Sequence, residues 1–247
     1  MSDKPSKGAC LVIGAGDGVG GAIARAFALD GNETVVTRRA RNLDQLESLA
    51  AGIRAEGGIV HIRGVDARSE EETVALFAEI ERDIGPLEVV VFNIGANVRF
   101  GIEETTARVF SKVWEMACFA GFLAGREAAK AMVPRGRGTI LFTGATASLR
   151  GRDGFAAFAA AKAGLRAQAP SLARARGAQG IPVAPRICVR GIDGVFSRQN
   201  IPDLERRLAE DRVLKPADIA QTYLDLHRQR RSAWTHELDL RPWSESW

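Results

Sequence analysis

The residues with the clearest chemical consequence stand four positions apart in one stretch of the sequence. Phe158 precedes Lys162 in the run Gly-Phe-Ala-Ala-Phe-Ala-Ala-Ala-Lys that begins at Gly154. Residues at this spacing lie on one face of a helix, so both side chains can face the same substrate. A lysine ammonium donates hydrogen bonds, whereas a phenyl ring neither gives nor takes a proton. The pair therefore predicts a site that keeps a binding cation and lacks an acid or base.

A glycine-rich run joins the first apolar stretch to a helical pattern. Residues Ala9 to Ile13 suit a buried strand, and Val19 to Leu29 suit a helix. The junction and the first helical residues are Gly14, Gly16, Asp17, Gly18, Val19 and Gly20. Glycines in that position let backbone amides approach a pyrophosphate, and the helix N-terminus adds favourable partial charge. We predict a dinucleotide phosphate site here; the alternative is a loop that only packs helix on sheet.

Apolar runs alternate with helical patterns along most of the chain. The predicted strands are 9–13, 34–37, 59–63, 88–92, 139–143, 183–189 and 236–240, and the predicted helices are 19–29, 42–55, 69–83, 105–132, 155–176, 203–210 and 216–228. This alternation predicts an α/β fold, a Rossmann-type doubly wound parallel sheet in a single domain over residues 1–247, with 1–7 as a flexible N-terminus. Pro170 is expected to kink its helix, and Pro182 and Pro185 to disturb the sixth strand.

The order of the motifs resembles the short-chain dehydrogenase/reductase (SDR) family over about Lys7 to Pro242. The matching residues are Gly14, Gly18 and Gly20 for the family's Gly-x-x-x-Gly-x-Gly, Asn93 and Gly95 for its Asn-Ala-Gly, and Asp66 for the aspartate that touches adenine. An Asx turn at a strand end is the alternative explanation for Asp66 and Asn93. The resemblance implies an oxidoreductase that binds a nicotinamide dinucleotide at these residues.

The end of the second predicted strand selects the cofactor. An acidic residue there binds the ribose hydroxyls of NAD, whereas an arginine pairs with the additional phosphate of NADP. The strand ends in Thr37 and is followed by Arg38 and Arg39, with no carboxylate at its tip. We therefore predict NADP(H) in preference to NAD(H); by resemblance Arg38 is the phosphate contact and Arg39 a second one. The alternative is that both arginines are solvated surface charges.

The SDR family uses an asparagine, a serine, a tyrosine and a lysine as a proton relay beside the nicotinamide. The resemblance places Ala117, Ala145 and Phe158 at the first three positions. It keeps Lys162, which would hydrogen-bond the nicotinamide ribose; the alternative is a solvated helix lysine. The hydroxyl groups that could orient a substrate oxygen instead belong to Thr143, Thr146 and Ser148. By the same resemblance, residues 193–216 form a lid over the substrate.

The tyrosine, cysteine and histidine residues give no sign of a replacement acid or of a metal site. The only tyrosine, Tyr223, lies in a helical pattern without a lysine at the same spacing, so it is a poor substitute for the missing phenol. The cysteines are Cys10, Cys118 and Cys188, which are far apart and are predicted to be buried reduced thiols. No histidine or cysteine pair has zinc spacing, so a metal site is not expected.

The net charge and the distribution of apolar residues restrict the kinds of partner that the protein could bind. The chain of 247 residues has a formal net charge of +4, but its arginines are scattered, so nucleic-acid binding is not expected. No apolar window approaches the roughly 18 residues of a membrane helix, and no signal peptide begins the chain. A soluble, cytoplasmic protein without membrane contact is therefore expected. Trp243 and Trp247 favour burial against a neighbouring subunit, which predicts a homodimer or homotetramer.

Two functions are compatible with these residues. The first is an NADP(H)-dependent oxidoreductase with a non-standard site, which transfers hydride to or from an apolar carbonyl or alkene. Such a protein would be slow, because a positioned acid or base contributes about 10²- to 10⁴-fold, and water or a substrate hydroxyl would replace it. The second is a non-catalytic NADP(H)-binding protein that senses the cofactor or supports an oligomer. Lys162 and the glycine run serve both.

Overall fold

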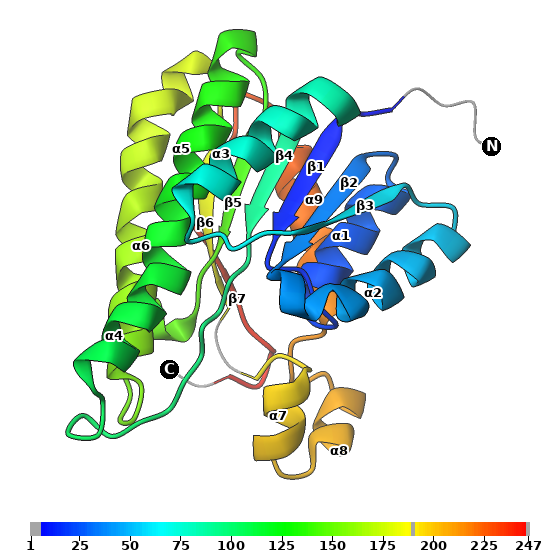
Figure 1. The fold of residues 1–247 in the computed structure, drawn as a ribbon. Coiled ribbons are helices and arrows are strands. Elements are labelled where there is room, and N and C mark those ends of the chain that lie inside the picture. The colour runs from blue at the N-terminus through cyan, green and yellow to red at the C-terminus, as the bar shows by residue number, and fades with distance from the viewer. Residues whose placement is uncertain (1–5, 189–190, 246–247) are drawn as a thin grey trace.

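A parallel sheet of seven strands forms the centre of the molecule (Figure 1). The computed structural model describes residues 6–188 and 191–245. The strands are β1 Ala9–Ile13, β2 Glu33–Arg38, β3 Val60–Gly64, β4 Leu87–Phe92, β5 Thr139–Thr143, β6 Val183–Cys188 and β7 Leu238–Leu240, in the order β3-β2-β1-β4-β5-β6-β7. The strand order reverses beside β1, which opens a crevice beyond the carboxyl ends of β1 and β4. The predicted Rossmann-type α/β sheet is confirmed.

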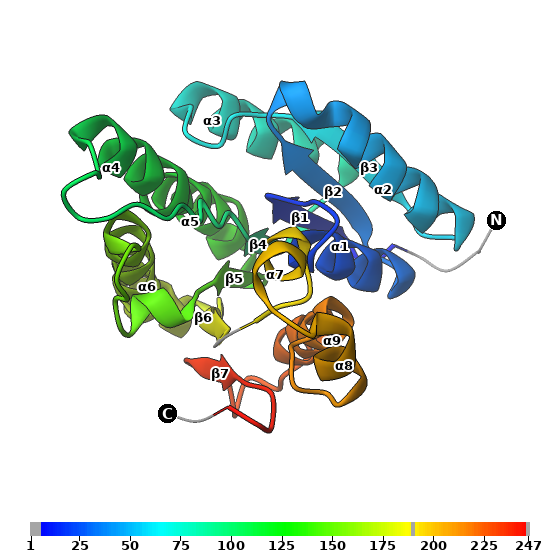
Figure 2. The same cartoon turned by 90° about the horizontal axis from the view of Figure 1, so that it is seen from below.

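Helices cover both faces of this sheet (Figure 2). One face carries α1 Val19–Leu29, α2 Leu43–Ala55 and α9 Pro216–His227, and the other carries α3 Glu70–Glu79, α5 Ala120–Met132 and α6 Ala156–Arg176. A separate apolar core lies on each face. The central strands β1, β4 and β5 are buried along their whole length. Burial on both faces explains why they are mostly continuous apolar runs.

A π-helical turn divides the long helical stretch that the sequence predicts over 105–132. Helix α4, Ala107–Trp114, begins at Thr106, whose side chain accepts a hydrogen bond from the backbone of Val109 at 3.2 Å. The π turn Glu115–Phe119 separates α4 from α5. Such turns interrupt helices most often at functional sites, and this one holds Ala117.

The prolines do not interrupt their elements. Helix α6 runs through Pro170 from Ala156 to Arg176, with the neighbouring Ala169 buried against the sheet. Strand β6 pairs with β5 from Val183, but it pairs with β7 only from Arg186 onward. Pro185 therefore precedes the part of the strand that has neighbours on both sides, where a missing backbone donor is tolerated. Residue 189, the predicted end of this strand, lies outside the described residues.

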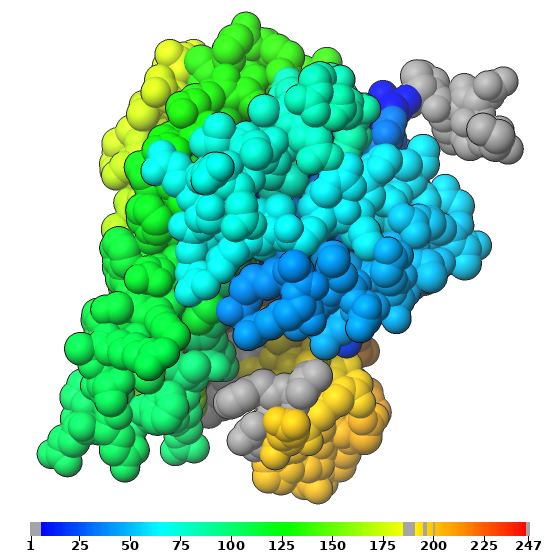
Figure 3. All heavy atoms as spheres, in the orientation of Figure 1, coloured from blue at the N-terminus to red at the C-terminus, as the bar shows by residue number. Residues whose placement is uncertain are grey.

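Residues 193–216 form an excursion beyond the carboxyl ends of the strands. They contain α7 Val195–Asn200, a helix absent from the prediction, and α8 Leu204–Ala209. An isolated bridge between Ile192 and Leu214 closes the base of the excursion. In the space-filling view the excursion is the gold lobe at the bottom of the molecule (Figure 3). Its role as a substrate lid stays a prediction.

The two ends of the described chain lie on opposite sides of the molecule (Figure 1). Near the N-terminus, the backbone N–H of Lys7 donates to the oxygen of Gly31 at 3.1 Å. Residues 1–5 of the predicted flexible N-terminus lie outside the described residues. Near the C-terminus, Trp243 is 76% exposed, and its indole N–H donates to the oxygen of Glu210 at 2.9 Å. Burial of Trp243 by another subunit stays a prediction, and Trp247 is not among the described residues.

Candidate functional site

A cavity of about 300 Å³ lies at the carboxyl ends of β1, β2 and β4. The residues that line it include Gly14, Arg38, Arg39, Asp66, Asn93 and Gly95, all predicted from the sequence to bind a cofactor. They come from four different strand ends, which the sheet order brings to one edge. Gly16, Asp17 and Gly18 follow Gly14 in the turn beside the cavity, and Val19 and Gly20 begin α1. Lys162 lies farther from the turn and reaches the cavity wall through Ile94.

The glycine turn after β1 is shaped by close contacts. Gly14 has a φ of +88°, a conformation that favours glycine. A Cβ atom at Gly20 would stand 2.6 Å from the main-chain oxygen of Gly14 and 2.7 Å from Nδ2 of Asn93, so no side chain fits there. A Cβ atom at Gly18 would meet no described atom within 4 Å. Since Gly18 immediately precedes α1, this open space lies where a helix N-terminus favours a phosphate.

Asn93 joins this turn to the end of β4. Its backbone N–H donates to the oxygen of Ile13 at 2.8 Å, and its side-chain amide donates to the oxygen of Gly14 at 3.1 Å. The side chain thus hydrogen-bonds a turn that is distant in the sequence, and this bond is not the Asx turn that was the alternative explanation for Asn93. Beyond it, Ala96 has a φ of +54°, which is uncommon for a residue other than glycine. Asn93 therefore fixes the shape of the cavity, whatever it contributes to a ligand.

Arg38 lies across the glycine turn. A Cβ atom at Gly16 would stand 3.3 Å from Nη1 of Arg38, and the same nitrogen contacts Oε1 of Gln45 on α2. Arg38 and Arg39 are both half-buried, so neither is a fully solvated surface charge. A guanidinium in this position can pair with a phosphate group held beside the turn.

Asp66 is bound to a neighbouring arginine that the sequence analysis did not single out. Arg68 donates from Nε to Oδ1 at 2.9 Å and from Nη2 to Oδ2 at 2.5 Å. This hydrogen bonding lowers the pKa of the Asp66 carboxyl from its ordinary value, against a smaller opposing effect of burial. Asp66 is therefore ionised near neutral pH and is held in place at the cavity wall.

Lys162 is buried, with only 2% of its surface exposed. Its Nζ atom donates to the main-chain oxygens of Ile94 and Thr143, each at 2.8 Å. A buried ammonium requires such acceptors, because removing a charge from water is costly. The alternative of a solvated helix lysine is therefore wrong. The side chain ties α6 to the ends of β4 and β5, and its contact with a ribose stays a prediction.

The positions that the resemblance assigns to the proton relay have apolar surroundings. Ala117 is fully buried in the π turn and belongs to an apolar cluster with Ala157 and Ala161 of α6. Phe158 is partly buried and packs against the same cluster. Ala145 is half-buried at the start of the short 3₁₀ turn that follows β5. None of these three side chains can transfer a proton.

Hydroxyl groups near these positions take part in internal hydrogen bonds. Ser148 donates from Oγ to the oxygen of Ala145 at 2.7 Å. The hydroxyls of Thr143 and Tyr223 share a hydrogen bond of 2.7 Å, in which either can be the donor. Thr146 lies half-buried in the turn between them. Orientation of a substrate by any of these hydroxyls stays a prediction.

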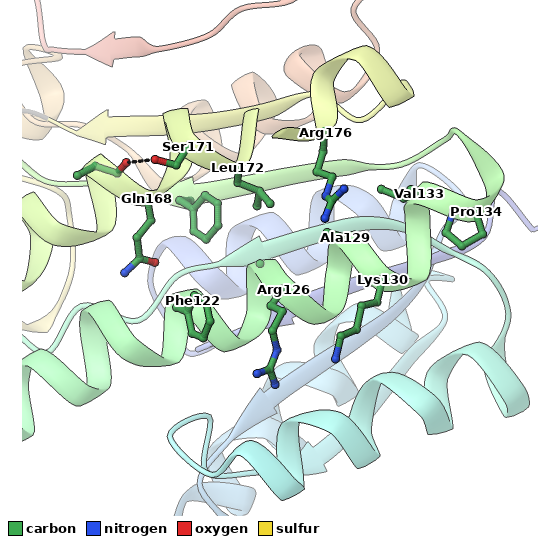
Figure 4. Close-up of a pocket in the computed structure, with 14 residues that line it drawn as sticks. Phe122, Arg126, Ala129, Lys130, Val133, Pro134, Gln168, Ser171, Leu172 and Arg176 are labelled. Carbon is green, nitrogen blue, oxygen red and sulfur yellow. Dashed lines mark hydrogen bonds between the residues drawn. The ribbon is translucent and has the colours of Figure 1, made fainter. Parts of the chain in front are cut away.

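A larger cavity, of about 610 Å³, lies between α5 and α6 on the outside of the molecule (Figure 4). Phe122 and Leu172 contribute to its apolar wall. Arg126 points from α5 toward α3, where it pairs with Glu70 at 2.7 Å. None of its lining residues is shared with the cavity at the glycine turn. Most of the residues predicted to bind the cofactor therefore gather at or beside the smaller cavity, whereas Lys162 and the relay positions do not line it.

Comparison with known proteins assigns the chain to a family. Residues 8–199 match the family model described as short chain dehydrogenase. The chain belongs to the short-chain dehydrogenase family. The relationship expected from the sequence motifs is thus confirmed, and this family member is an SDR-like protein of the oxidoreductase class, related to proteins that use a nicotinamide cofactor.

Relatives of this family member cover much of its length. A crystal structure of a short-chain dehydrogenase from Rhodopseudomonas palustris is 46% identical to it, covers 97% of this chain and 100% of its own, and superposes with a TM-score of 0.82. Gluconate 5-dehydrogenase of Gluconobacter oxydans is 30% identical over 173 residues, which are 70% of this chain and 67% of the relative. A metagenomic short-chain oxidoreductase in complex with NADP is 24% identical, over 96% of this chain and 98% of its own, with a TM-score of 0.81. At 24% identity, the metagenomic oxidoreductase shows only that the two proteins share a fold.

Three predictions concern features outside the cavity of this family member. Cys10 and Cys118 are buried free thiols, and burial raises the pKa of both, which disfavours the thiolate form. The side chain of Cys188 lies outside the described residues. The described residues contain no cluster of side chains that could hold a metal ion. Among the described helices, none is both long and apolar enough to cross a bilayer.

Sequence reasoning missed two residues of this family member, Gly21 and Arg68, and one hydrogen bond, between Tyr223 and Thr143. Gly21 lies so close to the oxygen of Gly16 that a Cβ atom would collide with it. This second glycine of the pair at the start of α1 was detectable from its position. Arg68 and the hydrogen bond of Tyr223 to Thr143 had no comparable pattern, because each depends on side-chain directions or on contacts between distant segments.

Proposed function

We propose that this family member binds NADP(H) at the glycine turn and acts as an SDR-like oxidoreductase with a non-standard active site. Its substrate class would be an apolar carbonyl or alkene. The observation that carries the cofactor proposal is the position of Arg38, whose guanidinium lies across Gly16 at the tip of β2. The cationic group and the turn share one cavity edge, so a phosphate on the ribose and the pyrophosphate can be bound together.

The residues at the tip of β2 support NADP(H) over NAD(H). Thr37 is buried there, and Arg38 and Arg39 follow it, both lining the cavity. A carboxylate in this position would bind the ribose hydroxyls of NAD and repel an additional phosphate.

The proposed active site lacks a proton donor of its own. When bound, the nicotinamide supplies or accepts a hydride. The side chains at the relay positions are all apolar, and Phe158 packs, partly exposed, on the apolar cluster that contains Ala117, so these positions favour an apolar substrate. We infer that the proton comes from water or from a hydroxyl of the substrate. Reaction is then slower by about 10²- to 10⁴-fold than with a positioned acid.

A specific observation favours the second candidate, a non-catalytic NADP(H)-binding protein. Lys162 donates hydrogen bonds to the main-chain oxygens of Ile94 and Thr143 and so holds α6 to the sheet. A lysine with that structural role would be retained even after catalysis had been lost. The two candidates agree on the cofactor and differ on turnover.

The cofactor proposal is tested by titrating the protein with NADPH and with NADH and following nicotinamide fluorescence. We expect wild type to bind NADPH at least about tenfold more tightly, because a charge-assisted arginine–phosphate pair is among the stronger hydrogen-bonded contacts. Arg38→Ala should remove most of this preference and leave NADH binding nearly unchanged. Arg41→Ala is the matched control, since Arg41 is exposed and does not line the cavity. Equal or reversed affinities in wild type would overturn the proposal.

A further inference from the structure

We propose that Arg68 controls recognition of the base, so that the cavity presents a guanidinium to the purine of the dinucleotide and does not select adenine. This inference rests on the proposed binding of NADP(H) and adds a specificity-determining residue to that site. Arg68 and Asp66 both line the cavity, as do their neighbours Val65 and Ala67. These residues follow β3 and are far from the glycine turn in the sequence.

Arg68 occupies the acceptor positions of the Asp66 carboxylate. Oδ1 accepts from the backbone N–H of Arg68 at 3.1 Å and from Nε at 2.9 Å. Oδ2 accepts from Nε at 3.2 Å and from Nη2 at 2.5 Å. An ionised carboxylate offers about four lone-pair sites, and the geometry directs four contacts from one residue to them. Little capacity is left to accept a hydrogen bond from an exocyclic amine.

Two glutamates outside the pair, Glu72 and Glu115, also hold Asp66 and Arg68 in place. The backbone N–H of Asp66 donates to Oε2 of Glu72 at 2.8 Å, which fixes the main chain that carries the carboxylate. Nη1 of Arg68 lies 3.8 Å from Oε2 of Glu115, at the start of the π turn. The side chains of Asp66 and Arg68 are 29% and 30% exposed, so both are partly shielded from solvent. The arrangement therefore places a guanidinium, flanked by carboxylates, at the cavity wall.

This placement changes which base edge fits. Adenine presents an amine donor beside N7, and that donor requires an acceptor on the protein. A 6-oxopurine presents two acceptors, O6 and N7, which an arginine can bind bidentately. Within the guanidinium, Asp66 accepts from Nε and Nη2, and Nη1 lies 3.8 Å from Glu115. A guanidinium has five N–H groups, so those of Nη1 and Nη2 that do not point at a carboxylate can serve a base. A dinucleotide with a 6-oxopurine should therefore bind at least as tightly as one with adenine.

The test compares NADPH with its deaminated form, reduced nicotinamide hypoxanthine dinucleotide phosphate, by fluorescence titration. For wild type we expect the deaminated form to bind within about threefold of NADPH or more tightly. Arg68→Ser releases Asp66, and NADPH should then bind about tenfold more tightly than the deaminated form, as a hydrogen bond to a charged acceptor predicts. Arg41→Ser removes the same charge from an exposed arginine outside the cavity and should behave as wild type.

The double variant Asp66→Ala with Arg68→Ser, which has no side-chain acceptor at position 66, separates base recognition from a general loss of structure. It should lose the adenine preference gained by Arg68→Ser while still binding both dinucleotides. A wild type that already prefers NADPH by tenfold, with no change in Arg68→Ser, would overturn the inference and leave the proposed function intact. Failure of wild type to bind either dinucleotide would overturn the proposed function and this inference with it.

Discussion

The guanidinium of Arg38 lies across Gly16, so that a Cβ atom on this glycine would stand 3.3 Å from Nη1. The contact joins the tip of β2 to the turn after β1. A phosphate bound at the turn therefore meets backbone N–H groups on one side and a cation on the other. Two segments that are separate in the sequence would thus form one anion site.

Alanine at two neighbouring glycines should have different effects. At Gly20 a methyl group would collide with the oxygen of Gly14 and with Asn93, so the variant should be destabilised by several kcal/mol. At Gly18 the space is open among the described residues, so the variant should unfold at nearly the wild-type urea concentration. If that space receives the pyrophosphate, Gly18→Ala should nevertheless weaken NADPH binding by about tenfold or more. Unchanged NADPH affinity in Gly18→Ala would place the pyrophosphate elsewhere.

Removal of the Tyr223 hydroxyl should destabilise the fold. Tyr223 is fully buried, and its hydroxyl shares a bond of 2.7 Å with that of Thr143. Tyr223→Phe leaves a buried hydroxyl without this partner, so the free energy of unfolding should fall by roughly 1–3 kcal/mol, measured by urea denaturation. Combined with Thr143→Val, the loss should be smaller than the sum of the two single losses. Strict additivity would show that the two hydroxyls do not stabilise each other.

Stability should decrease in mild acid because of His227. Its ring accepts or donates a 2.9 Å bond with Thr139 and packs edge-on against Phe27. Burial lowers the pKa of this histidine from its ordinary value of 6.5, more than the nearby Glu88 and Asp30 raise it. The unfolded chain therefore binds a proton below about pH 6.5 that the folded chain does not, and stability falls as the pH decreases.

The measurement for His227 is urea unfolding at pH 7.5 and at pH 5.5. Wild type should lose stability between these values, by at most about 1.4 kcal/mol per pH unit from this one group. His227→Phe should show a smaller loss over the same interval, although its stability at pH 7.5 is lower. A variant with the same pH dependence as wild type would exclude His227 as the cause.

Much of the fold, and many of the residues that line the cavity at the glycine turn, could be predicted from the sequence because local patterns encode them. Strand β1, the glycine turn and α1 are adjacent in the chain, and the steric need for Gly14 and Gly20 follows from the turn itself. Lys162 was recognisable by its position, but its burial was not. Whether a helix lysine faces water or a strand end depends on packing between α6 and the sheet.

Other parts depend on contacts that no local pattern contains. Thr143 and Tyr223 lie 80 positions apart, so their hydrogen bond arises only when α9 packs on β5. The pairing of Arg68 with Asp66 joins near neighbours, but a side-chain rotamer decides it. Helix α7 is short, and a helix of that length is stabilised mainly by tertiary contacts and not by propensity.

The central claim is that an intact NADP(H) site stands beside a relay without a proton donor. The most direct measurement is the rate of NADPH oxidation at saturating cofactor, over a panel of apolar carbonyls and alkenes, for wild type and for Ala145→Ser with Phe158→Tyr. We expect slow wild-type turnover that rises by about 10²- to 10⁴-fold when the hydroxyl and the phenol are introduced. A wild type at background with a gain in the variant would favour the non-catalytic candidate. Fast wild-type turnover that the restored residues do not raise would contradict the account.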